Sequence, residues 1–392
     1  MNYPDRLQEI LVERIAMNDS EKLRKAIEAN QKFLTVDYYN LRPNQSQKDT
    51  IQDLVLLNVP TQQLTLLHVA AYYDSLECII ALIELGLDVD VKTRDGYTPL
   101  MYACASGSYE SALYLLENKA DFKLLPNERL HSCLYLAVSP EGPEILKLLF
   151  EYGAEYPKEI LKESPIARAI KTKSMSCLLI LLNHAYKTST YLDGDLSPLM
   201  QAIANYVDDS IEPLLEFNGD PNFVNSKGNT ALLLAIRRNS LPIVQTLVKH
   251  GASVDCREFQ SGSTPVHLAC DKGNLEMLKF LVDSGANIFA LDAKNRPATF
   301  NTINAPSPEL VVQLLEYLTE KGLDLNARDK DGTTLLLELM PDSKRALPPV
   351  IEFLLSNGAK ADIKNEHGKT ALDLAKAFKD PQIIELFKKY SK

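Results

Sequence analysis

The sequence predicts an all-α solenoid of stacked helix–turn–helix units, and three columns of recurring residues carry that prediction. The first column is a short residue, usually Thr or Ser, that returns every 32 to 37 residues. We call these residues the anchors: Thr65, Thr98, Ser132, Ser164, Ser197, Thr230, Thr264, Pro297, Thr334 and Thr370. Two positions after the anchor, nine of the ten residues are aliphatic, and five positions after it, eight of the ten are Ala. Such a fixed period indicates repeats that stack on their neighbours.

Each column predicts one part of the unit. The anchor hydroxyl can accept a hydrogen bond from an unpaired backbone N–H, so the anchor is expected to begin the first helix. The Ala column lets neighbouring first helices lie close together. A Leu seventeen residues after the anchor, such as Leu115, belongs to a second helix. A glycine such as Gly251 ends that helix as a left-handed C-cap, and pairs such as Asp95-Gly96 mark a short hairpin turn before the next anchor.

Three segments are predicted along the chain. Residues 1–30 read as a degraded N-terminal cap, since their apolar residues follow the order of a repeat and their ends are polar. Residues 31–60 fit no repeat and predict an irregular insertion, a long loop followed by a short helix. Residues 61–392 contain about ten repeats. In the eighth repeat we expect a lengthened second helix, with Thr299 and Thr302 in core positions, and in the ninth we expect extra residues near Pro341 to Pro349.

This order of capped helix, second helix and hairpin turn resembles the ankyrin repeat. Residues 93–122, TRDGYTPLMYACASGSYESALYLLENKADF, carry nearly the whole motif, and the resemblance extends over about residues 61–392. It implies an ankyrin-repeat α-solenoid with short β-hairpin fingers. It also implies that partner proteins dock on a groove lined by the hairpins and first helices, and that His68 and His267 have structural roles.

Composition and charge restrict the partners. The formal net charge of −10 disfavours non-specific binding to nucleic acid or anionic membranes. No apolar run approaches the roughly 20 residues that span a bilayer, and the polar N-terminus lacks the core of a signal peptide. The six Cys are scattered without a CxxC pair, which favours a reducing compartment. We therefore expect a cytoplasmic location, or the host cytosol if the chain is a secreted effector, with a nuclear location still open. We also expect a monomer.

No motif in the sequence points to catalysis. Phosphate-binding loops, dinucleotide fingerprints and nucleophile elbows are absent, and the six His lack the short spacing of zinc motifs. Cys104 and Cys270 directly follow the Ala column, so we expect both to be small buried residues. The sequence therefore predicts a protein that is not an enzyme and that needs no cofactor or metal.

The binding residues are expected just before an anchor and seven to nine residues after it, where side chains should be exposed. Tyr is a favoured binding anchor, and the basic residues stand out on an acidic chain. The candidates are Tyr72, Tyr73, Arg94, Tyr97, Asn205, Tyr206, Lys227, Arg237, Arg238, Asp271 and Lys272. The alternative is that the Tyr rings pack at an edge and the charges are merely solvated.

These observations predict a protein-binding scaffold or adaptor. Two other functions use the same fold: an adaptor that recruits an enzyme such as a ubiquitin ligase, and a secreted bacterial effector that binds a host protein. Because the repeats run nearly to Lys392, no appended recruitment domain is expected. A catalytic activity hidden in the irregular repeats is a fourth alternative.

Overall fold

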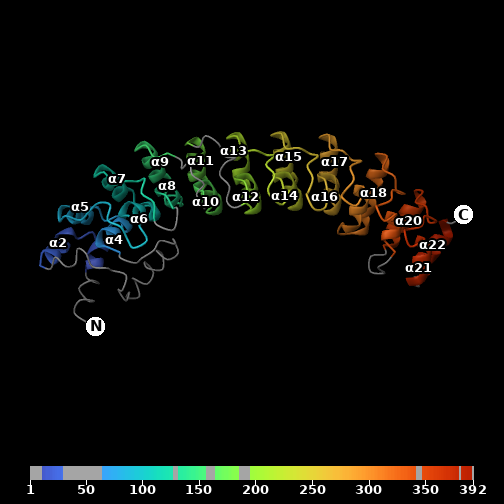
Figure 1. Cartoon of the computed structure of the whole chain (residues 1–392), viewed down its shortest axis with the longest axis horizontal. Helices are drawn as coiled ribbons and strands as arrows, with labels where there is room; N and C mark the ends of the chain where they lie inside the picture. The colour runs from blue at the N-terminus through green and yellow to red at the C-terminus, as the bar shows by residue number, and fades with distance from the viewer. Residues whose placement is uncertain are drawn as a thin grey trace. The chain divides into compact units, whose positions relative to one another are not determined.

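The computed structural model describes residues 11–29, 64–126, 131–155, 164–184, 195–340, 347–378 and 381–390. The chain divides into two compact units, Met1–Gly219 and Asp220–Lys392, and pairs of helices recur in both (Figure 1). The described residues contain no strand, so the prediction of an all-α solenoid is confirmed. The predicted insertion at 31–60 and residues 341–346 of the ninth repeat lie outside the described residues.

In the unit Met1–Gly219, the first helices of successive repeats are α4 (Leu66–Tyr72), α6 (Pro99–Ser106), α8 (Cys133–Leu136), α10 (Pro165–Lys171) and α12 (Pro198–Ala204). The second helices are α5 (Leu76–Glu84), α7 (Tyr109–Glu117), α9 (Pro143–Glu151), α11 (Met175–His184) and α13 (Ile211–Glu216), the last preceded by η4 (Asp208–Ser210). Figure 1 shows the two sets as two rows.

In the unit Asp220–Lys392, the first helices are α14 (Ala231–Arg237), α16 (Pro265–Asp271), η5 (Ala298–Asn304), α19 (Leu335–Glu338) and α21 (Ala371–Phe378). The second helices are α15 (Leu241–Lys249), α17 (Leu275–Asp283), α18 (Pro308–Glu320), α20 (Pro348–Ser356) and α22 (Pro381–Tyr390). Each unit therefore repeats the same pair of antiparallel elements.

The anchors begin the first helices, as predicted. Every anchor from Thr65 to Thr334 is the N-cap of its helix. The Ser197 hydroxyl, for example, accepts a hydrogen bond from the Met200 N–H at 3.3 Å. At the final anchor, the Asp373 N–H donates to the Thr370 hydroxyl at 3.1 Å. The sequence signal for helix starts is therefore a physical cap, repeated along the chain.

The Ala column and the Leu residues seventeen positions after the anchors contribute to the core. Ala103 and Ala235 of the Ala column are fully buried, and α4 packs on α6 as α14 packs on α16. Leu115 and Leu247 of the second helices are also fully buried. Small residues on the first helices let adjacent repeats approach closely, while the Leu side chains fill the space between the two rows.

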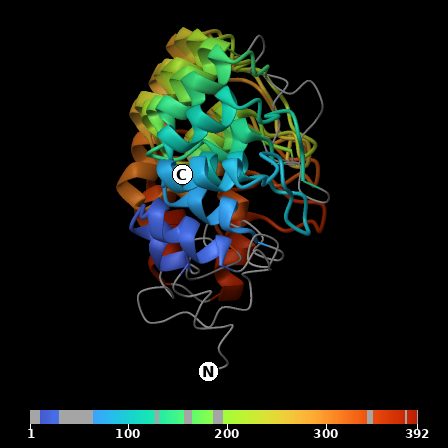
Figure 2. The same cartoon turned by 90° about the vertical axis from the view of Figure 1, so that its left-hand side faces the viewer.

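Hairpin turns separate the repeats and lie to one side of the helices (Figure 2). In the first such turn, the Thr93 N–H donates to the Tyr97 carbonyl and the Gly96 N–H donates to the Thr93 carbonyl, both at 2.9 Å. In the described part of the chain, β structure is limited to isolated bridges such as the one between Arg328 and Thr334. The expected β-hairpin fingers are therefore tight turns without assigned strands.

The eighth repeat departs from the pattern where its sequence does. Its first helix is the 3-10 helix η5, and the buried Thr302 hydroxyl donates to the Thr299 carbonyl at 2.7 Å. That bond satisfies the polar group that replaces Ala. Its second helix α18 has 13 residues, whereas α17 of the preceding repeat has 9, which confirms the predicted lengthening.

At the N-terminus, a helical segment at 11–16 and α2 (Ser20–Glu28) pack on the first complete repeat. Leu11, Ile15 and Leu23 are buried, and the Ser75 hydroxyl donates to the Ile15 carbonyl at 2.6 Å. The helix α2 contacts α5. Across the residues that the structure describes, no helix is both long and apolar enough to cross a bilayer.

Candidate interaction face

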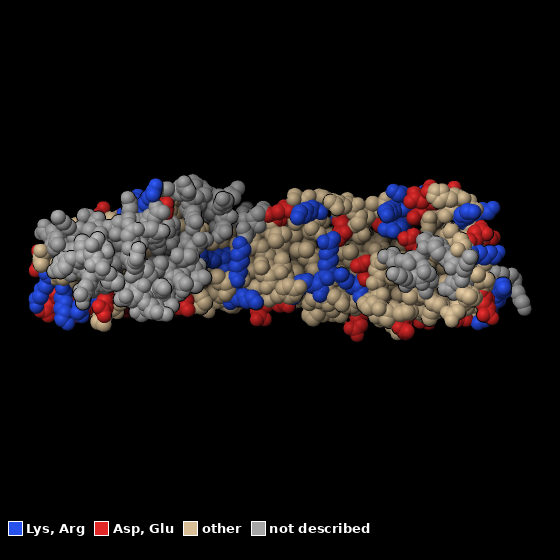
Figure 3. Space-filling model, turned by 90° about the horizontal axis from the view of Figure 1, so that it is seen from below, with Lys and Arg blue, Asp and Glu red and all other residues tan. Residues whose placement is uncertain are grey.

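The residues selected from the sequence lie at the ends of first helices and in hairpin turns, and they divide between the two units. Six belong to Met1–Gly219 and five to Asp220–Lys392. Figure 3 views the molecule from the side of the first helices, and Lys and Arg side chains form separate groups along that face.

Tyr72 and Tyr73 form a fixed aromatic pair at the end of α4. Both side chains are half-buried, and their rings meet edge to face with centroids 5.5 Å apart and an interplanar angle of 85°. The Tyr72 carbonyl accepts a hydrogen bond from the Ser108 hydroxyl of the next repeat at 3.0 Å. The pair therefore combines packing within the array with a partly exposed aromatic surface.

The expectation that Tyr97 is exposed is wrong. Its side chain is fully buried, and its hydroxyl lies 3.1 Å from Nδ1 of His131. Its carbonyl accepts a hydrogen bond from Nε2 of His68 at 3.0 Å. The residue directly before the anchor turns inward here because it closes the hairpin turn onto the preceding repeat. Arg94, at the other end of that turn, is exposed as expected.

The His68 ring explains why this turn is anchored inside. Its Nδ1 accepts from the Thr65 N–H at 3.2 Å, so Nε2 carries the proton that is donated to the Tyr97 carbonyl. Burial lowers the pKa of His68 to about 4. His267 repeats the arrangement, with Nδ1 3.3 Å from the Thr264 nitrogen and Nε2 3.0 Å from the Arg296 carbonyl. Both rings join one repeat to the next.

Asn205 and Tyr206 lie just beyond α12. Asn205 is the C-cap, and its Nδ2 donates back to the Gln201 carbonyl at 2.9 Å. Tyr206 adopts a left-handed φ of 58° and is 68% exposed. This ring is the most exposed aromatic side chain that the sequence analysis selected.

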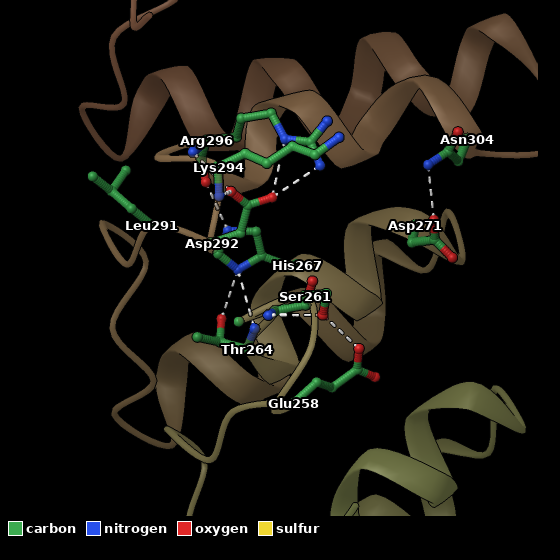
Figure 4. Close-up of polar contacts among 12 residues, drawn as sticks. Glu258, Ser261, Thr264, His267, Asp271, Leu291, Asp292, Lys294, Arg296 and Asn304 are labelled. Atoms are coloured by element: carbon green, nitrogen blue, oxygen red, sulfur yellow. Dashed lines mark hydrogen bonds and ion pairs between the residues drawn. The ribbon is translucent and has the colours of Figure 1, made fainter. Parts of the chain in front are cut away.

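In the second unit, Arg237 reaches from α14 to the turn before α16. Its guanidinium pairs with the Glu258 carboxylate, whose other oxygen accepts from the Ser261 hydroxyl at 2.6 Å (Figure 4). The Arg237 side chain is 45% exposed and the Glu258 side chain 12%. The carboxylate is thus largely covered, whereas the cation still faces solvent.

Arg238 and Lys272 are equivalent residues of neighbouring repeats. They are the C-caps of α14 and α16, two helices that pack together, and both are half-buried. The Asp271 carboxylate accepts from Nδ2 of Asn304 at 2.9 Å, which links α16 to η5 (Figure 4). Lys227 is exposed on the turn before α14. Three predicted cations, Arg237, Arg238 and Lys272, therefore lie at the ends of two adjacent first helices, and Lys227 lies on the turn before the first of them.

Phe259 is the residue that sequence reasoning missed. It follows Glu258 in the hairpin turn and is 67% exposed. The ring lies against Gly228 of the preceding turn, because a Cβ added to Gly228 would come within 2.4 Å of the Phe259 Cγ. The available signal was a single large apolar residue in the otherwise polar stretch Arg257 to Ser263.

The Asp292 carboxylate has structural partners within its own turn. Burial opposes ionisation of Asp292, but hydrogen bonds from the Arg296 and Lys294 N–H groups and from the Arg296 side chain keep its pKa below the usual value (Figure 4). Burial raises the pKa of the Cys270 thiol. Among the described residues, no group of three or more His, Cys, Asp and Glu side chains has an arrangement that could hold a metal ion.

Comparison with known proteins identifies the repeat. A family model for ankyrin repeats in three copies matches residues 27–125 and 199–292. The Arabidopsis thaliana E3 ubiquitin-protein ligase KEG is 25% identical over 340 residues, which cover 81% of this chain and 21% of that protein. The Mus musculus B-cell lymphoma 3 protein homolog is 30% identical over 268 residues, which cover 64% of this chain and 56% of that protein.

The likeness is therefore to part of each relative, since the chain spans about a fifth of the first and just over half of the second. Among solved structures, the ankyrin repeat domain of Bcl-3 matches with a TM-score of 0.49 and 21% identity. That match covers 58% of this chain and 98% of the solved domain.

Proposed function

Because this chain belongs to the ankyrin-repeat family, whose stacked repeats form protein-interaction scaffolds, we propose that it is an adaptor that binds a partner protein. The partner would dock on the ends of the first helices and the hairpin turns. The observation that carries this proposal is the contrast along each first helix. The Ala column is buried in the core, whereas the helix ends and turns expose residues such as Tyr206, Lys227 and Arg237.

Binding without catalysis is the activity that the polar groups support. The thiols of Cys104 and Cys270 are buried in the core, where a substrate would not reach them. In each of the buried histidines His68 and His267, Nδ1 bonds the N-cap residue of the same helix and Nε2 bonds the next repeat. We therefore assign no catalytic residue, cofactor or metal to this chain, and we assign it to the cytoplasm as a monomer.

The organisation that we propose keeps residues 1–30 as a cap, 31–60 as an insertion and 61–392 as the repeat array. The support for the cap is the burial of Leu11, Ile15 and Leu23 against the first complete repeat. A terminal helical pair of this kind shields the core of the array from solvent.

Affinity capture with the full chain, followed by mass spectrometry, tests the adaptor function. The proposal expects one or more specific proteins, and their absence from every relevant lysate would contradict it. Two double variants then test whether the partner docks on the helix ends: Tyr72→Ala/Tyr73→Ala and Arg237→Ala/Arg238→Ala. Each double variant is expected to lose about 2 kcal/mol or more of binding free energy. Gln245→Ala/Lys249→Ala on the second helix α15 is the control. Lost helicity in the Tyr variant would instead favour a packing role for the pair.

A narrower function, recruitment to ubiquitin ligation, is favoured by one observation. The Arabidopsis relative that aligns over 81% of this chain is named as an E3 ubiquitin-protein ligase. Captured proteins should then include ubiquitin-conjugating or ligase components, and a captured target should be ubiquitinated faster when this chain is added to a reconstituted reaction. An unchanged rate would argue for a scaffold of another kind.

A further inference from the structure

We infer that the second unit binds an acidic peptide segment that carries one large apolar side chain. The docking surface consists of Lys227, Arg237, Arg238, Phe259 and Lys272, and we call it the Phe259 surface. This inference rests on the proposed adaptor function and names the chemistry of the partner. Two features of the surface lead to it, an exposed aromatic ring and an excess of cations.

The apolar feature is the Phe259 ring. It is 67% exposed although it belongs to an otherwise polar turn. Its inner side is held against the backbone of Gly228, where no side chain intervenes. An aromatic ring that is held in place before binding loses little conformational freedom when a partner covers it. The ring therefore offers apolar contact area at a low entropic cost.

The charged feature begins at the adjacent residue. Glu258 is turned inward, and its carboxylate is bonded by both Arg237 and Ser261. A guanidinium has five N–H donors, so Arg237 can bind a second carboxylate while it keeps Glu258. Because Glu258 precedes Phe259 in the chain, the cation and the exposed ring belong to one small area.

Further cations border this area. Lys227 precedes Gly228, on which the Phe259 ring lies, and it is exposed. Arg238 and Lys272 occupy the ends of the two packed helices α14 and α16. The carboxylates of Glu258 and Asp271 both accept hydrogen bonds within the unit. The Phe259 surface thus contributes four cations on a chain whose net charge is −10.

These features fit a peptide better than a nucleic acid. A single-stranded nucleic acid is bound by a long cationic track with several stacking rings, whereas this surface has one ring and a short group of cations. A few residues of extended peptide span the distance between neighbouring first helices, at about 3.3 Å per residue. One apolar side chain on Phe259 and flanking carboxylates on Arg237 and Lys272 therefore match the surface.

A purely structural role explains only part of the surface. Cations at helix C-termini are favoured by the helix dipole, which accounts for Arg238 and Lys272. The Arg237–Glu258 ion pair also joins two repeats. Neither explanation involves the Phe259 ring, which lies against Gly228, stays 67% exposed and directly follows Glu258 of the ion pair.

Selection of random 12-residue peptides on phage against the full chain tests the inference. The enriched peptides should share acidic residues around one large apolar residue. A synthetic peptide of that sequence should bind about tenfold or more weakly to Phe259→Ala and to Arg237→Ala. Phe289→Ala is the matched control, since Phe289 is also exposed, at 60%, in the second unit. That variant should change the affinity less than twofold.

Several results would overturn the inference. Failure to enrich any peptide, enrichment of basic peptides, or equal binding to the wild type and to both variants would each do so. Tighter binding of an oligo-thymidine strand than of the selected peptide would assign the surface to nucleic acid instead. Circular dichroism and the thermal midpoint of each variant verify that it is folded.

The captured proteins separate this inference from the adaptor function. If Phe259→Ala and Arg237→Ala retain every captured protein, the Phe259 surface is not the docking site, although the chain still binds proteins. If the wild-type chain captures no protein but binds acidic peptides at this surface, the inference stands and the adaptor proposal fails.

Discussion

At the scale of the residue, the direction of a side chain in a turn depends on contacts with the next repeat. Arg94 and Tyr97 lie in the same hairpin turn, yet Arg94 is exposed and Tyr97 is buried. Periodicity specifies that both positions belong to the turn, but the inward direction of Tyr97 follows from the His68 ring that holds its carbonyl and from His131 beside its hydroxyl. The direction of a single side chain can therefore be predicted best where its partners in the neighbouring repeat are known.

The buried His68 ring predicts a dependence of stability on pH. Its pKa is about 4 in the folded chain and about 6.5 when unfolded, so between these values only the unfolded state takes up the proton. The free energy of unfolding should therefore fall as the pH is lowered from about 6.5 to about 4, by up to about 3 kcal/mol from this ring. Chemical denaturation at a series of pH values measures the free energy of unfolding.

The difference between wild type and His68→Gln isolates this contribution, because the carboxylates titrate in both proteins. The stability advantage of the wild type over His68→Gln should shrink as the pH is lowered over that range. A constant difference between wild type and His68→Gln from pH 7 to pH 4 would contradict the prediction.

The Ala column predicts the cost of overpacking. Ala103→Leu and Ala235→Leu insert bulk between packed first helices, and each should lower the free energy of unfolding by about 1–3 kcal/mol. Ala204→Leu provides the control, since Ala204 is exposed at the end of α12. Urea denaturation measures the free energy of unfolding of each variant. Stabilities equal to that of Ala204→Leu would mean that these alanines are not tightly packed.

At the scale of the element, successive hairpin turns stack through their backbones. The Ala293 N–H donates to the Ser261 carbonyl at 2.9 Å, and the Lys330 N–H donates to the Lys294 carbonyl at 3.0 Å. Gly262 has a φ of +66°, and a Cβ there would lie 2.7 Å from the Ala293 nitrogen. Glycine at position 262 therefore permits both the positive φ of its own turn and the close approach of the next hairpin turn.

Gly262→Ala should consequently cost more stability than Gly368→Ala. Gly368 has a similar φ of +71°, but a Cβ there meets nothing within 4 Å. Strain at positive φ costs about 1–2 kcal/mol at either glycine, and the clash with Ala293 adds to that cost at Gly262 alone. Urea denaturation of both variants compares how much unfolding free energy each one loses. Equal losses would indicate that the turns can move apart without penalty.

At the scale of the whole molecule, the chain consists of two units in which each repeat contacts mainly its neighbours. The stability of such an array is close to a sum of repeat and interface contributions. Partial unfolding is therefore expected within one unit while the other stays folded, and a single unfolding free energy for the whole chain hides this behaviour.

Hydrogen–deuterium exchange can show which helices each overpacking variant destabilises. Ala103→Leu should speed exchange in α4, α6 and α8, with little change in α14 and α16. Ala235→Leu should do the reverse, which makes the two variants controls for each other. Uniformly faster exchange along the whole chain in both would show that the array unfolds as one cooperative body.

The sequence by itself determined the period, the start of each first helix and the buried columns. These features depend on local capping and on side-chain spacing, which the chain repeats about ten times. It also predicted where the eighth repeat would deviate, from Thr302 in place of Ala. Only the tertiary structure decided that Tyr97 faces inward, that Arg237 pairs with Glu258 and that Phe259 is exposed over Gly228. These outcomes depend on contacts between different repeats, because a turn's side-chain directions follow its neighbour's shape and not the period of the sequence.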